Sequence, residues 1–194
     1  MKSVMARCAV ILGITMCGLG SIAGLAQSEG SSANWFRISL NGGKLNGVKW
    51  GLSATGLKER PLKRVCAVMT EVAPPEPGTE FAEGSETTSC GRLLQATDSI
   101  TLSSDFPSDN SDATELRATL YPKDVRKVTF ILADGQRSTI RARGINVKSR
   151  KIKGIPFFRY LVARFSAGAC VEQVVSYDRA GRVIHREKGD RSCP

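Results

Sequence analysis

VRKVTFILADGQRSTIRAR at residues 125–143 and CVEQVVSYDRAGRVIHREK at residues 170–188 decide the fold class. Each stretch is an alternating apolar run, then a turn built around Asp and Gly, then a basic return segment. This pattern is typical of a β-hairpin, in which side chains alternate between the two faces of a strand. The two stretches together predict a β-rich scaffold.

The turn chemistry sets the register of both hairpins. In the first, a three-residue loop at residues 133–135 keeps the apolar side chains on one face, whereas a two-residue loop would split them between the two faces. That register sets Lys127 opposite Arg141. In the second hairpin the same reasoning sets Val175 opposite His185, and the His is expected to pack half-buried.

The chain from Trp35 onward repeats short alternating runs separated by turn residues, with a first hairpin expected to turn at residues 41–43. No long window shows helical periodicity. Residues 73–89 are rich in Pro and Glu and are expected to form an exposed loop. We therefore expect a single all-β domain over residues 35–194, an antiparallel sandwich or open barrel built from hairpins.

Residues 1–26 have the pattern of a secretory signal peptide. A basic start is followed by an uncharged, mostly apolar run and by small residues at the cleavage positions. The polar residues 27–34 then read as a linker. We expect a secreted or extracytoplasmic protein, with an uncleaved N-terminal membrane anchor as the alternative because the apolar run approaches the ~18 residues that span a bilayer.

Four cysteines remain after the signal peptide, and export places them in an oxidising compartment. Four cysteines allow three connectivities. We favour Cys66 with Cys90 and Cys170 with Cys193, because both pairs close short loops of similar length. The sequence therefore predicts two disulfides.

The net charge of +10 lies in the second half of the chain, where residues 123–194 carry 17 Lys and Arg against six Asp and Glu. Lys127 facing Arg141 is a like-charge pair that is mildly destabilising unless an anion binds there. A coherent positive field is therefore expected over the first hairpin and the basic loop that follows it. The anion-binding candidates are Lys127, Arg137, Arg141, Arg143, Lys148, Arg150, Lys151 and Lys153.

No combination of residues in the sequence predicts catalysis. His185 with Asp178 is the one pairing that could serve a hydrolase, and the sequence around Ser53 does not match a GxSxG nucleophile elbow. Residues 103–112 are rich in oxygen ligands but lack the spacing of a calcium loop, and no CxxC pair supports zinc. We expect no metal site and no cofactor.

Four short motifs resemble a group of secreted actinobacterial proteins. They are a Trp50-Gly51-Leu52 strand, Cys66 followed by Cys90-Gly91, a valine-rich strand ending in LADG at residues 132–135, and a YDRAG turn at residues 177–181. The resemblance covers most of residues 48–185. It implies export and a β fold, and it supplies no catalytic residues.

The function that these observations favour is a non-catalytic binding or structural module with a basic surface. Its expected partners are anionic cell-envelope polymers or lipid headgroups, and nucleic acid is not expected. Two alternatives stay open at this point, namely an extracytoplasmic hydrolase and a membrane-anchored envelope accessory protein.

Overall fold

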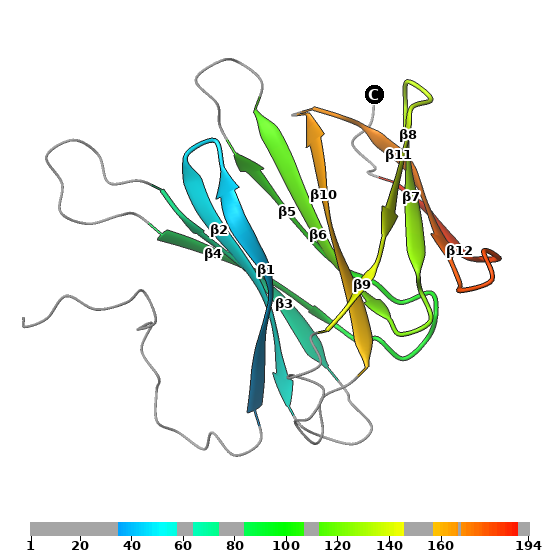
Figure 1. Ribbon diagram of the computed structural model, residues 1–194, viewed down its shortest axis with the longest axis horizontal. Helices are drawn as coiled ribbons and strands as arrows, with labels where there is room; N and C mark the ends of the chain where they lie inside the picture. Colours follow the sequence, from blue (N-terminus) through cyan, green and yellow to red (C-terminus); the bar gives the residue numbers. More distant parts are fainter. Residues whose placement is uncertain are drawn as a thin grey trace, which may run out of the picture. The chain divides into compact units, whose positions relative to one another are not determined.

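A computed structural model describes residues 35–57, 64–73, 84–106, 113–145, 157–166 and 168–189. These residues form twelve strands in three open antiparallel sheets, with no helix among them (Figure 1). The order is β1-β2-β3-β4 in sheet A, β5-β6-β10-β9 in sheet B and β12-β11-β7-β8 in sheet C. The strands are β1 (Trp35–Leu45), β2 (Val48–Leu57), β3 (Val65–Val72), β4 (Gly84–Gly91), β5 (Ile100–Phe106), β6 (Thr114–Pro122), β7 (Lys127–Leu132), β8 (Arg137–Arg141), β9 (Arg143–Gly144), β10 (Phe158–Ser166), β11 (Val171–Tyr177) and β12 (Val183–Lys188).

The β1–β2 hairpin turns later than the sequence predicts. Residues 41–43 continue β1 beyond a β-bulge, and the turn falls at Asn46 and Gly47, which have φ angles of 47° and 82°. Two successive positive φ angles are what a two-residue turn of type I′ requires, and Asn-Gly is its preferred sequence. The Asn41-Gly42-Gly43 prediction was wrong because these residues continue the strand pairing, and the two glycines leave room for Trp50: an added Cβ would lie 3.0 Å from its backbone oxygen at Gly42 and 3.4 Å from its ring Nε1 at Gly43.

The predicted Cys66–Cys90 disulfide is present and joins β3 to β4, where the two residues are direct cross-strand partners. The expected exposed loop at 73–89 is shorter in the structure, since residues 84–89 belong to β4 and continue the pairing that the disulfide anchors. Residues 74–83 lie outside the described part of the chain. Cys193 does too, so the Cys170–Cys193 bridge stays a prediction.

The interior strand β6 of sheet B is buried on both faces, which makes the fold a sandwich with sheet B as the shared layer. Leu116, Ala118 and Leu120 of β6 belong to the core cluster that includes sheet A residues, whereas Tyr121 on its other face belongs to the cluster that includes sheet C residues. In that second cluster, Phe130 and Phe165 meet edge to face with ring centroids 5.2 Å apart. β6 is accordingly buried along its length from Leu116 to Pro122.

The β7–β8 hairpin has the predicted register. Lys127 pairs with Arg141 and Val128 with Ile140, and Gly135 closes the turn with a φ of 83°. This confirms the three-residue loop.

The β11–β12 hairpin departs from the predicted register. A bulge after Tyr177↔Val183 sets His185 opposite Ser176 instead of Val175. No turn residue signals this irregularity, which shifts the following pairs by one residue.

The described residues also bear on the cellular compartment. The Cys66–Cys90 disulfide indicates an oxidising, extracytoplasmic environment. None of the described residues belongs to a helix with the length and apolarity that crossing a bilayer requires. The expected signal peptide at 1–26 and the linker at 27–34 lie outside the described residues.

Candidate anion-binding site

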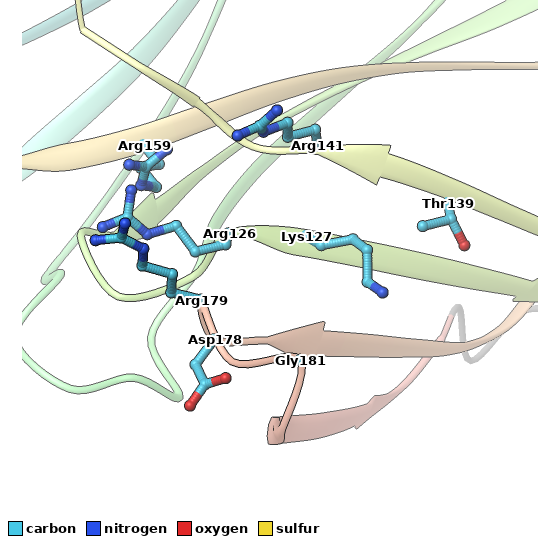
Figure 2. A pocket seen from close by; sticks show the side chains of 8 residues that line it. All are labelled: Arg126, Lys127, Thr139, Arg141, Arg159, Asp178, Arg179 and Gly181. Atoms are coloured by element: carbon cyan, nitrogen blue, oxygen red, sulfur yellow. The ribbon is translucent and has the colours of Figure 1, made fainter.

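A pocket of about 580 Å³ lies on sheet C, where the start of β7 and the end of β8 meet the β11–β12 turn (Figure 2). We call it the basic pocket. Five of its eight lining residues are cationic and one is acidic, so it concentrates positive charge. Its lining residues are Arg126, Lys127, Thr139, Arg141, Arg159, Asp178, Arg179 and Gly181.

The like-charge pair predicted from the hairpin register lies in this pocket. Lys127 and Arg141 are directly opposite on β7 and β8, and both side chains are exposed. The Lys127 Nζ also lies 4.6 Å from the centroid of the Tyr177 ring, a cation–π contact between neighbouring strands. The pair therefore places two positive charges side by side in the basic pocket.

Arg159 enters the pocket from β10, a strand of sheet B. Its Nε donates to the backbone oxygen of Lys123 at 3.1 Å, and its Nη1 donates to the backbone oxygen of Ala142 at 2.9 Å. These bonds use two of the five N–H groups of a guanidinium. They fix the cation in place and tie β10 to the segment before β7 and to the residue that joins β8 to β9.

Arg126 and Arg179 come from two loops that hydrogen bonds bring together. The Arg126 backbone N–H donates to Tyr177 O at 2.8 Å, and Ala142 N donates to Arg126 O at 2.9 Å. Figure 2 shows the guanidinium groups of Arg126, Arg159 and Arg179 gathered at one end of the pocket. Three planar forks at one place suit the oxygens of a phosphate or a carboxylate.

Asp178 does not neutralise this cluster, because Arg182 already occupies its carboxylate. Arg182 N donates to Oδ1 at 2.9 Å and Arg182 Nε donates to Oδ2 at 2.8 Å. The backbone hydrogen bond from Arg182, followed by the side-chain bond and charge of the same residue, lowers the pKa of the Asp178 carboxyl. The acid therefore stays ionised and belongs to the turn.

A second hollow of about 490 Å³ adjoins the basic pocket and shares Arg126, Asp178 and Arg179 with it. It adds Asp124 and Arg182 to the charged surface. These two charges have opposite sign, so the cations that the two hollows share, Arg126 and Arg179, account for the positive charge of the second hollow.

The structure separates the sequence-predicted candidates. Lys127 and Arg141 lie in the basic pocket, whereas Arg143 on β9 lines a different hollow and Arg137 lies at the opposite end of β8. The other four candidates, Lys148, Arg150, Lys151 and Lys153, lie outside the described residues.

Sequence reasoning missed three arginines that complete the pocket, Arg126, Arg159 and Arg179. Arg126 immediately precedes Lys127, and Arg179 lies in the predicted YDRAG turn. The sequence shows both residues to be cationic, but it does not show that they lie close together. Their proximity follows from the pairing of β7 with β11, which joins the two hairpins.

The pairing considered for a hydrolase gains no support from this geometry. Both carboxylate oxygens of Asp178 accept hydrogen bonds from Arg182, and His185 is half-buried on β12 opposite Ser176. Within the described ranges, no group of three or more His, Cys, Asp or Glu side chains is arranged to hold a metal ion. The arrangement is suited to binding anions by fixed cations.

Comparison with protein-family models, curated proteins and solved structures gives no match for this chain. The resemblance to secreted actinobacterial proteins therefore stays an expectation from the sequence.

Proposed function

We propose that this chain is an extracytoplasmic, non-catalytic binding module that holds an anionic envelope polymer or lipid headgroup in the basic pocket. The observation that carries the proposal is the convergence of five cations, from β7, β8, β10 and the flanking loops, around one acid that is already bound to Arg182. Such an excess of positive charge is costly unless an anion offsets it.

The kind of cation indicates the kind of ligand. Four of the five are arginines, whose planar guanidinium groups bind phosphate or carboxylate oxygens through two parallel hydrogen bonds. The volume of about 580 Å³ falls in the range of ligand sites. Binding through several charge contacts should weaken as salt rises.

The compartment is the second part of the proposal. The Cys66–Cys90 disulfide supports it, and export through a cleaved segment at 1–26 would explain it. Mass spectrometry of the protein isolated from cells should find a mature start near Gln27. An intact N-terminus in the membrane fraction would instead favour the anchored accessory protein.

The decisive test compares two double variants that remove the same charge. Arg126→Gln with Arg179→Gln removes two of the three guanidinium groups at one end of the basic pocket, while Arg137→Gln with Arg186→Gln removes two exposed arginines outside it. The probes are inorganic polyphosphate and vesicles of phosphatidylglycerol in phosphatidylcholine. We expect the pocket variant to lose about tenfold or more in affinity, because hydrogen bonds to charged groups are among the strongest.

The control variant should lose less than about twofold, the effect of exposed charges on the long-range field. Equal losses in both variants would mean that net charge and not the pocket binds the anion. If the wild type binds neither probe, the proposed function is wrong. Binding of polyphosphate alone would favour a polymer, and binding of vesicles alone would favour a headgroup.

A further inference from the structure

Among the residues that the structure describes, no strand lies beside most of one edge of β10. β10 pairs with β6 along its full length, but on the other side β9 covers only Arg159 and Tyr160. Within the described part of the chain, residues 161–166 have no strand partner on that side. An interior strand of sheet B thus becomes an edge strand for the rest of its length (Figure 1).

The proline in β6 shows which backbone groups of β10 point outward. Phe158 pairs with Pro122, and because proline has no N–H this must be a non-hydrogen-bonded pair of the antiparallel ladder. Hydrogen-bonded and non-hydrogen-bonded pairs alternate along such a ladder. The N–H and C=O groups of Val162, Arg164 and Ser166 therefore point away from β6.

This edge opens onto two hollows. One of about 330 Å³ is lined by Leu161 and Val162, and one of about 560 Å³ is lined by Arg164, Phe165 and Ser166. β8 contributes Ile140 and Arg141 to the first hollow. It contributes Ser138 to the second, which is otherwise lined by the β7–β8 turn and residues 168–170. Val162, Arg164 and Ser166 thus line hollows, and no strand among the described residues pairs with them on this side.

The composition of this edge differs from that of the β12 edge of sheet C. Edge strands are usually protected by charge or by bulges, and β12 has both, with Arg186, Glu187 and Lys188 near its end and a bulge near its start. The uncovered part of β10, LVARFS, has one charged residue and contributes Leu161, Ala163 and Phe165 to the core. It is the kind of edge that accepts another strand.

We propose that the uncovered edge of β10 binds an extended acidic peptide of a partner protein by strand addition. The peptide would pair with β10 on the same side as β9, along the residues that β9 does not reach. Six residues of strand span about 20 Å. Charge complementarity selects an acidic peptide, because Arg141, Arg143 and Arg164 line the two hollows against the single acid Asp134. This site does not rest on the proposed function, although Arg141 lines both it and the basic pocket.

The test separates the backbone hydrogen bond from the side chain. Arg164→Ala removes the charge and keeps the N–H, whereas Arg164→Pro removes both, and proline is tolerated where the N–H of an edge strand faces away from its sheet. The probe is a labelled peptide of alternating Glu and Val, long enough to span residues 161–166. We expect Arg164→Pro to bind it roughly fivefold more weakly than Arg164→Ala, from one lost backbone hydrogen bond.

Amide hydrogen exchange on the wild type provides a readout that does not depend on how well either variant folds. The acidic peptide should slow exchange at the amides of Val162 and Arg164 and leave that of Glu187 on β12 unchanged. The same peptide with Lys in place of Glu should bind at least about tenfold more weakly. Absence of protection at Val162 and Arg164, or equal affinity of the two Arg164 variants, would overturn the proposal.

Discussion

Gly135 closes the β7–β8 turn with a φ of 83°, a backbone conformation that side chains with a Cβ rarely adopt. A Cβ added there would meet no atom within 4 Å, so the restriction on this residue is conformational and not steric crowding. The length of this turn fixes the pairing of Lys127 with Arg141. A single glycine therefore sets the position of two cations of the basic pocket.

Replacing Gly135 by Ala should lower the free energy of unfolding by about 1 kcal/mol, because the left-handed conformation is costly for Ala. Gly84→Ala is a matched control, since Gly84 is exposed at the start of β4 and a Cβ there makes only ordinary contacts. Urea denaturation of both variants measures the difference. Equal stability of the two would contradict the role of the φ angle.

The Asp178 carboxyl should make the β11–β12 turn sensitive to acid. Its pKa is lowered by Arg182, so the charged form is favoured in the folded state. The stabilisation is present above the unfolded pKa and is lost as the pH falls through the lower folded pKa. Wild type and Asp178→Asn should therefore differ in melting temperature at neutral pH and converge in strong acid. A difference independent of pH would argue against the ionised carboxylate.

The sequence predicted the neighbours of a residue correctly where both residues belong to the β7–β8 hairpin. The Lys127–Arg141 pair follows from one turn and was found, whereas Arg159 joins it from β10 through a pairing that no local pattern encodes. The three arginines were therefore missed because the sequence does not show which distant segments meet in the fold, although their charge was evident.

At the scale of strands and turns, the Cys66–Cys90 disulfide is a covalent link between two neighbouring strands. It links β3 to β4 across a sequence separation of 24 residues, and β4 itself is largely exposed. A strand with little buried surface depends on such a link, because burial contributes little to its stability.

Replacing Cys66 and Cys90 together by Ala should lower the free energy of unfolding by about 3 kcal/mol, the loop-closure entropy that the bridge removes from the unfolded chain. Thermal denaturation of the variant, compared with the oxidised wild type, measures this loss. If the reduced wild type melts at the same temperature as the oxidised one, the bridge does not stabilise the domain.

Hairpins were the elements that sequence reasoning predicted best. The β7–β8 register was right in every pair considered because turn length and apolar alternation agree there. The β11–β12 register shifted at a bulge, and the β1–β2 turn moved from residues 41–43 to Asn46 and Gly47. In both cases an extra residue in a strand changed the register without a distinctive sequence.

For the whole molecule, the central feature is that sheet B serves two cores. Leu116 and Leu120 pack toward sheet A, and Phe165 and Leu161 pack toward sheet C, so neither core can open without exposing sheet B. The sequence indicated a sandwich or open barrel but could not place one sheet between two others, because the assignment depends on which distant strands pair.

Phe165→Ala should lower the free energy of unfolding by about 3 to 5 kcal/mol, because it removes a buried ring that contacts Phe130 and leaves a cavity. Leu94→Ala, at a residue that is 58% exposed, should change it by less than about 0.5 kcal/mol. Both tryptophan fluorescence, from Trp35 and Trp50, and far-ultraviolet circular dichroism should report the same shifted transition. Separate transitions would show that the two cores unfold independently.

The pairing of β6 with β10 also sets the pace at which the molecule forms. Thr114 pairs with Ser166 and Pro122 with Phe158, so the whole of β7, β8 and β9 must be made before β6 meets its partner. The local hairpins can close in about 1–10 μs, whereas a sheet built on distant pairs takes on the order of milliseconds to seconds. Until β10 arrives, the apolar faces of β6 are exposed to other chains. A newly made molecule is therefore most prone to aggregate in that interval.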